Sequence, residues 1–142
     1  MNVWIEKSGV RCLAVLLACF ALTGCQENRL PLHPVLGALM VDDARAEGAL
    51  VTFLPQDKDR KYLPSYARVE KDGSFHGFTY VKDDGVPAGN YVLAIEWPEV
   101  IEGSDEPGPD RLKGRFVRDQ TLRFTVKPGN NSLPPIRLES GK

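Results

Sequence analysis

The sequence has few cysteines, few histidines and no excess of charge of either sign. Its three cysteines, Cys12, Cys19 and Cys25, all lie in the first 25 of 142 residues, so the remainder of the chain can form no disulfide framework. The two histidines, His33 and His76, stand far apart, and no His-x-x-x-His or Cys-x-x-Cys spacing occurs. We therefore expect no transition-metal site and no cofactor. Eighteen Lys and Arg residues oppose nineteen Asp and Glu residues, which excludes the basic surplus that holds a nucleic-acid backbone.

Long apolar runs are also scarce. The clearest one, residues 12–21, has about half of the ~20 residues that a helix needs to span a bilayer. Lys7 and Arg11 precede it, as in a secretory signal peptide. The run leads into Leu22-Thr-Gly-Cys25, which resembles the lipobox of bacterial lipoproteins: a branched apolar residue, two small residues, and a cysteine that is acylated after cleavage. An ordinary signal peptide with a chance cysteine and a short transmembrane anchor are the alternatives.

The lipoprotein resemblance implies a division of the chain into three parts. Residues 1–24 would be the signal peptide, and Cys25 would carry two or three acyl chains such as palmitate, which hold a protein on a membrane stably where a single chain does not. Residues 25–34 would form a polar, proline-rich tether with a reach of about 30 Å, and residues 35–142 the folded domain. Gln26 stands where many inner-membrane lipoproteins have Asp. We expect an extracytoplasmic, membrane-anchored protein, with the outer membrane favoured.

The folded part is predicted to be all-β, because 13 glycines and 11 prolines separate short runs of aromatic and β-branched residues. In the clearest strand, Tyr91, Leu93, Ile95 and Trp97 alternate with smaller or polar residues and so share one face. The dipeptide Asp72-Gly73 predicts a hairpin. No helix is expected, and residues 98–120 are predicted to be a long connection. The seven predicted strands are 35–41, 48–55, 66–70, 74–80, 91–97, 121–127 and 133–138.

Several stretches carry a further resemblance: His33-Pro34-Val35 with Gly37, Ala46 to Phe53, Asp72 to Phe75, Pro87 to Tyr91, Glu96 to Pro98, and Pro109 to Gly114. Together they resemble the small bacterial lipoproteins that carry a carboxypeptidase-regulatory-like domain. This resemblance implies a transthyretin-like (prealbumin-like), Ig-like sandwich: a seven-stranded Greek-key β-sandwich that acts as a structural or binding module without a catalytic role. The family usually has Asp-Gly-Lys-Pro after its first strand, where this chain has Asp42-Asp43-Ala44-Arg45.

The segment 103–118 is the candidate binding loop, because loops on a rigid sandwich commonly carry recognition. Its first half is acidic and its second half basic, with an aromatic residue among the cations. The alternative is that the segment only covers a sheet edge and prevents edge-to-edge pairing. The candidate binding residues are Asp105, Asp110, Arg111, Lys113, Arg115 and Phe116.

Other chemistries are weaker candidates. Exposed tyrosines could stack on sugar rings, and the candidates are Tyr62, Tyr66 and Tyr80. Oxygen ligands for calcium could come from two acidic loops, one with Asp83 and Asp84 and one with Glu99, Glu102, Asp105, Glu106 and Asp110.

Catalysis is not expected. No Gly-x-Ser-x-Gly turn accompanies either histidine, although a carboxylate pair for glycoside hydrolysis stays open. The transthyretin-fold enzyme hydroxyisourate hydrolase ends in a Tyr-Arg-Gly-Ser signature, whereas this chain ends Leu138-Glu-Ser-Gly-Lys142. The sequence thus favours a non-catalytic, lipid-anchored structural or protein-interaction module of the cell envelope, whose partner is an envelope protein or polysaccharide. A carbohydrate-binding module is the first alternative, and a hydrolase the second.

Overall fold

A computed structural model describes residues 29–57, 63–119 and 121–141, and these are almost entirely strands and turns. The predicted all-β class is confirmed. Within the described ranges no helix is long and apolar enough to cross a membrane. The elements are β1 (Leu32–His33), β2 (Val35–Val41), β3 (Ala44–Arg45), β4 (Leu50–Pro55), β5 (Ser65–Arg68), β6 (Ser74–His76), β7 (Val86–Pro87), β8 (Gly89–Glu96), α2 (Arg115–Arg118), β9 (Arg123–Val126), β10 (Asn131–Ser132) and β11 (Ile136–Leu138).

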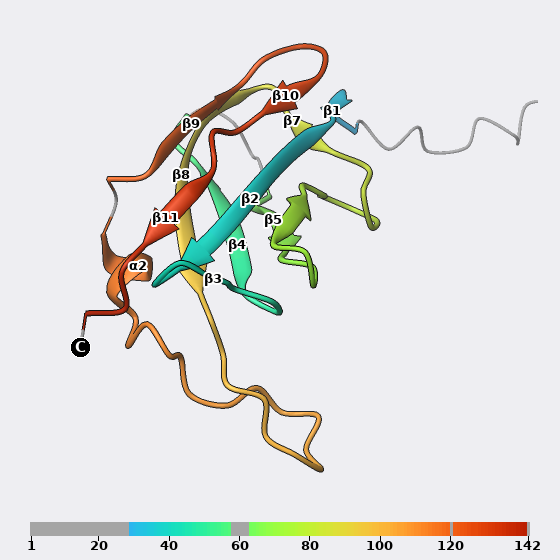
Figure 1. The fold of residues 1–142 in the computed structure, drawn as a ribbon. Helices are drawn as coiled ribbons and strands as arrows, with labels where there is room; N and C mark the ends of the chain where they lie inside the picture. The colour runs from blue at the N-terminus through green and yellow to red at the C-terminus, as the bar shows by residue number, and fades with distance from the viewer. Residues whose placement is uncertain (1–28, 58–62, 120, 142) are drawn as a thin grey trace, which may run out of the picture.

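Two sheets face each other in a sandwich-like arrangement (Figure 1). One is antiparallel, with the strand order β5-β4-β8-β9. The other is built on β2, which pairs in parallel with β10 and β11 and antiparallel with β3 and β6. A small third pairing joins β1 to β7. The segment that holds β1 therefore pairs with the residues just before the central strand.

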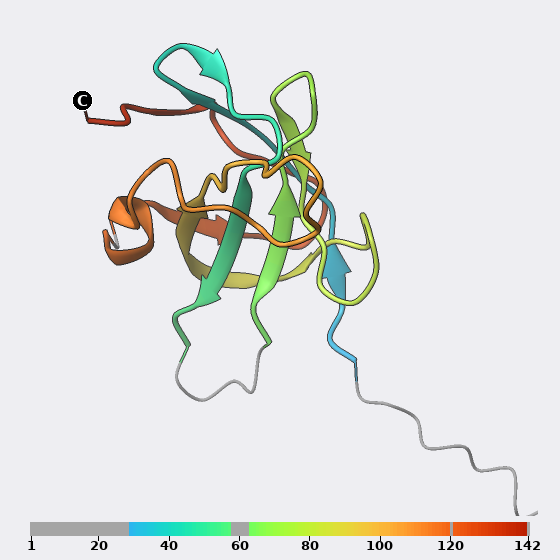
Figure 2. The same cartoon turned by 90° about the horizontal axis from the view of Figure 1, so that it is seen from below.

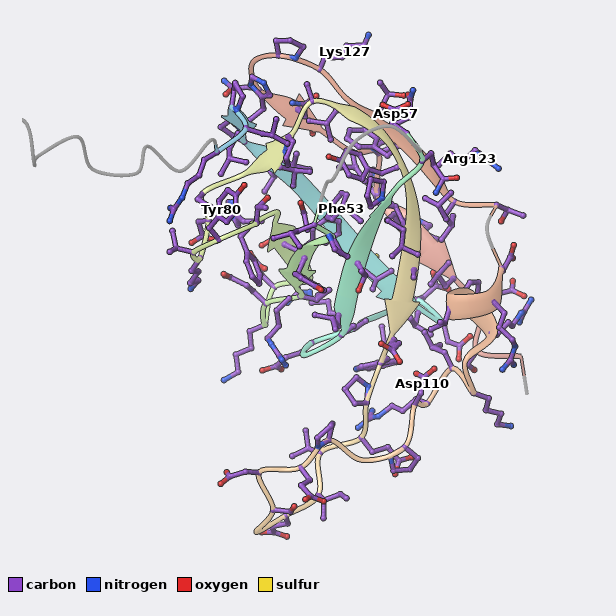
Figure 3. All side chains as sticks on the ribbon, turned by 180° about the vertical axis from the view of Figure 1, so that it is seen from behind. Phe53, Asp57, Tyr80, Asp110, Arg123 and Lys127 are labelled. Carbon is purple, nitrogen blue, oxygen red and sulfur yellow. The ribbon has the colours of Figure 1, made fainter. Side chains whose placement is uncertain are left out.

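The core lies between these two sheets. The face predicted for the central strand lies in the core, because Tyr91, Leu93 and Ile95 of β8 belong to the core cluster and Trp97 packs against it. Val92 and Ala94 on the other face are buried as well. Across the core, β2 contributes Val35, Leu39 and Val41. β4, the neighbour of β8 in its own sheet, contributes Val51 and Phe53. The ring of Phe53 meets that of Tyr91 edge to face at 6.0 Å, and Figure 3 shows Phe53 in the interior.

The predicted hairpin around Asp72-Gly73 is present at both ends, since Tyr66 and Phe78 form an antiparallel bridge in register with the turn. A tight turn is present, with Glu70 N donating to Ser74 O and Gly73 N donating to Glu70 O. However, β5 pairs with β4 in one sheet, whereas β6 pairs with β2 in the other. The physical reason is Gly37 of β2, since a Cβ there would lie 2.2 Å from Phe75 Cζ. The bare glycine gives Phe75 its place in the core and draws β6 onto β2.

Each of the seven predicted strands overlaps an observed one, and four further strands of two residues each complete the set. The turn expected at residues 42–45 is a tight two-residue connection between β2 and β3, with Asp42 and Asp43 at φ of 48° and 62°. Two residues with positive φ match the right-handed twist of a hairpin. The expectation of no helix was wrong, because the one-turn helix α2 lies within residues 98–120, which the sequence predicted to be a connection without secondary structure.

Candidate interaction site

Beyond β8 the chain leaves the body of the protein and returns along itself. Glu99 N donates to Pro109 O at 3.0 Å, Gly108 N donates to Glu99 O at 3.0 Å, and Arg111 N donates to Trp97 O at 2.9 Å. Residues 97–99 and 108–111 thus form a short antiparallel neck. We call residues 99–107 the excursion; every one of them is exposed. Figure 1 shows it projecting beyond the ends of the strands, and Figure 2 shows the same end of the molecule face on, with the excursion in front.

The Asp110 carboxylate holds the neck together, and Figure 3 shows it where the excursion joins the body. Its Oδ1 accepts the backbone N–H groups of Trp97 at 2.8 Å and Leu112 at 3.0 Å, and its Oδ2 accepts that of Gly114 at 2.7 Å. The chain can double back around this carboxylate because Lys113 and Gly114 adopt left-handed conformations, with φ of 54° and 66°. Asp110, a candidate binding residue, is therefore engaged in holding the backbone.

A stacked pair supports the same neck. The Arg111 guanidinium lies 4.8 Å from the centre of the Trp97 ring, a distance at which a cation is attracted to the ring face. The indole N–H of Trp97 donates to Glu47 O at 3.0 Å. The neck is thereby tied to the turn that precedes β4, which fixes the direction in which the excursion projects.

The second half of the segment folds back onto the body. Leu112 and Phe116 are buried in the core, with 1% and 7% of their surface exposed. One guanidinium nitrogen of Arg115 donates to Glu139 O at 3.2 Å, and Lys113 is exposed. Phe116, grouped in the sequence with the cations of a binding loop, is a core residue that anchors α2.

The structure therefore separates the six candidate residues. Asp110 and Arg111 lie in the neck, Phe116 and Arg115 fasten the returning chain, and Lys113 and Asp105 are exposed. The alternative weighed for the whole segment was that it covers a sheet edge, and the packing of α2 against β8 is compatible with it. Recognition of a partner by this segment stays a prediction. The part of the segment exposed for such recognition is the excursion.

Sequence reasoning missed the two apolar residues of the excursion. Val100 is 89% exposed and Ile101 is 46% exposed. Acidic residues flank them, with Glu99 and Glu102 next to the pair and Asp105 and Glu106 further on, and no basic residue occurs between positions 98 and 110. An adjacent apolar pair in an otherwise polar, proline-rich connection was the available signal.

A second surface feature lies between the end strands of the two sheets. We call it the edge groove, a cavity of about 250 Å³. β9 ends one sheet and β11 flanks β2 in the other, and the cavity opens between them. Its walls are apolar apart from two arginines, Arg123 and Arg137, of which Arg137 also contacts Asp43 at 3.2 Å with both side chains largely exposed. The groove is lined by Leu93, Leu122, Arg123, Phe124, Leu133, Pro134, Pro135, Ile136 and Arg137.

Two further cavities, of about 460 and 360 Å³, meet at His76 and Asp83. Their sizes fall in the range of small-molecule sites, about 300–1,000 Å³. The larger one carries Arg68 and Lys82 beside Glu70 and Asp83. Cations and anions alternate along this wall, so no single class of charged ligand is favoured.

The other sequence candidates have structural contacts of their own. Asp84 accepts the backbone N–H groups of Thr79, Tyr80 and Val81 at 2.7–3.0 Å. Among the residues that the structure describes, no three His, Cys, Asp or Glu side chains are grouped to hold a metal ion.

Two of the tyrosines proposed for sugar stacking have ring contacts of their own. Tyr66 is half-buried, with its ring 6.1 Å from that of Phe78. Tyr80 is 38% exposed, and the Arg29 guanidinium lies 4.9 Å from its ring centre. Tyr62 and Cys25 fall outside the described residues.

Taken together, these contacts describe a small sandwich-like body that holds an apolar, acidic excursion away from itself on a clamped neck. Such a surface is suited to recognition of another molecule. Comparisons with known proteins found no matching family model, no matching curated protein and no matching solved structure.

Proposed function

We propose that this chain is a lipid-anchored, extracytoplasmic interaction module of the bacterial cell envelope, without catalytic activity of its own. Cys25 provides the anchor and residues 25–34 the tether, whose last part, β1, pairs with β7 of the body. Residues 35–142 form a seven-stranded Greek-key sandwich of the carboxypeptidase-regulatory-like, transthyretin-like kind. The lipobox-like Leu22-Thr-Gly-Cys25 supports the anchor. The two facing sheets support the sandwich.

One observation carries the interaction role: the excursion presents Val100 and Ile101 to solvent on a neck that the backbone ladder and Asp110 hold in place. Single exposed apolar residues are ordinary, but an apolar cluster with a polar rim is typical of an interaction site. A pre-ordered loop also loses less conformational entropy on binding than a flexible one.

The charge of the excursion defines the partner further. Its acidic side chains repel the anionic phospholipid headgroups that attract basic segments, so insertion into an anionic bilayer is disfavoured. They favour a protein surface that combines an apolar recess with basic residues, because complementary charge increases the rate and specificity of association. The partner class is therefore a protein with a basic, apolar recess.

Photo-cross-linking in native membranes tests this role. A photoactivatable residue at position 100 is expected to give recurrent intermolecular cross-links to protein. The matched control is position 81, because Val81 is also largely exposed, at 63%, but lies on the loop after β6. Equal cross-linking from both positions, or none from position 100, would contradict the proposal. Cross-links from position 100 only to polysaccharide would favour the carbohydrate-binding alternative.

The anchor has a test of its own. Metabolic labelling with a fatty acid is expected to mark the wild-type chain and to be lost in Cys25→Ala, together with sedimentation of the chain with membranes. A Cys25→Ala chain that keeps both its label and its membrane association would exclude acylation at this cysteine.

A further inference from the structure

The excursion and the edge groove are complementary in charge and polarity although they lie on different parts of the body. Two aliphatic side chains, Val100 and Ile101, project between Glu99 and Glu102. The groove offers apolar walls, and its two arginines are Arg123 and Arg137. Figure 1 shows the excursion beyond one end of the strands, whereas β9 and β11 lie along the side of the sandwich.

The size of the groove restricts what can occupy it. At about 250 Å³ it is smaller than the about 300–1,000 Å³ typical of small-molecule sites. A pair of aliphatic side chains needs less room than a whole ligand.

We propose that the excursion of one copy docks in the edge groove of a second copy, so that the chain associates with itself head to tail. Val100 and Ile101 enter the apolar cavity, while Glu99 and Glu102 face Arg123 and Arg137. The existing Arg137–Asp43 pair is solvent-exposed, and exposed pairs contribute little, so Arg137 can exchange Asp43 for an incoming carboxylate. This inference rests on the proposed function and names its partner.

Head-to-tail contacts use different surfaces on the two molecules, so they build chains or rings rather than a closed two-fold dimer. One excursion and one small groove make a limited interface, and such interfaces are weak in dilute solution. Confinement of lipid-anchored copies to one membrane raises their effective concentration. We therefore expect association on a membrane and a monomer in dilute solution.

Mixed-isotope cross-linking tests the proposal. A ¹⁴N full-length chain with a photoactivatable residue at position 101 is mixed with an unmodified ¹⁵N chain, and both are reconstituted in phosphatidylcholine vesicles. The expected product joins the ¹⁴N excursion to ¹⁵N residues 121–137. Only contact between two copies gives this isotope pair, since contact within one copy gives ¹⁴N on both sides.

Charge reversal then tests the docking geometry. With Arg123→Glu and Arg137→Glu in the ¹⁵N chain, the mixed product is expected to fall at least about tenfold, because like charges would face each other. Glu99→Lys and Glu102→Lys in the ¹⁴N chain are expected to restore it. The matched control is Lys82→Glu with Lys127→Glu, two exposed cations outside the groove lining, which should leave the yield unchanged.

A fold control and three further outcomes separate self-association from the alternatives. Circular dichroism verifies that every variant is folded, and restoration by the compensating pair cannot come from a misfolded chain. No mixed-isotope product at residues 121–137, or a product insensitive to the groove charges, would overturn self-association. If the probe in native membranes instead captures a different protein, the interaction role stands and only this partner is wrong. If it captures nothing, both proposals fail.

Discussion

Replacement of Asp110 tests the clamp on which the excursion depends. The carboxylate accepts three backbone N–H groups, from Trp97, Leu112 and Gly114. A hydrogen bond to a charged group contributes about 1.5–3 kcal/mol, but the three bonds share one half-exposed side chain and do not add. We expect Asp110→Ala to lower the free energy of unfolding by about 3 kcal/mol. At a typical urea slope of about 1.5 kcal/mol/M, the midpoint would fall by about 2 M.

Asp110→Asn is the matched control, because it keeps the shape and removes one acceptor. With its oxygen in the place of Oδ1, it still accepts from Trp97 and Leu112 but turns an NH₂ group toward the Gly114 N–H. The expected loss is about half that of the alanine variant. Trp97 fluorescence is a suitable probe in urea, since the only other tryptophan is Trp4.

Amide hydrogen exchange localises the effect. In Asp110→Ala the amides of Trp97, Leu112 and Gly114 should exchange faster than in wild type, while those of β2 change only in proportion to global stability. An unchanged urea midpoint together with unchanged exchange at these three amides would refute the clamp.

Three further predictions address the core and the turn before β6. Gly37→Ala would place a Cβ 2.2 Å from Phe75 Cζ, and overpacking of this kind costs about 1–3 kcal/mol. The melting temperature should therefore fall, and an unchanged melting temperature would contradict this contact. Phe116→Ala should cost about 3–5 kcal/mol in urea unfolding if the ring is buried, and close to nothing if it lies at the surface. Hydrogen bonds from the Ser74 hydroxyl and then the Ser74 N–H lower the pKa of Asp72. The contribution of the Asp72 carboxylate to folding stability is therefore complete above its unfolded pKa of about 3.9, and it is lost as the pH falls through the lower folded pKa. Ser74→Ala should therefore lose less stability than wild type on acidification below about pH 4, and parallel pH profiles would contradict the shift.

The part of the fold that could be predicted follows from short-range patterns. Tyr91, Leu93 and Ile95 alternate in sequence because β8 has one face in the core, and that periodicity is visible without tertiary information. The partners of β6 could not be predicted in the same way. They depend on the fit of the Phe75 ring over Gly37, and those residues are far apart in sequence.

The candidate site was harder to predict for the same reason. Phe116 stands among arginines in a segment without periodicity, so its burial depends on a one-turn helix that tertiary packing stabilises. Asp110 has the composition of an acidic surface loop, and its role follows only from the left-handed turn that brings three N–H groups to one carboxylate. The exposure of Val100 and Ile101 likewise requires knowledge of the neck.

Hydrogen exchange of the excursion shows whether a partner covers it in the membrane. Exchange at residues 99–107 is measured on the chain in its native membranes and on the same chain solubilised and diluted, with the loop of residues 79–84 as the internal reference. We expect slower exchange in the membrane at the excursion but not at the reference loop, because a docked partner covers Val100 and Ile101. Equal exchange of the excursion in the two states would contradict its role as an interaction surface.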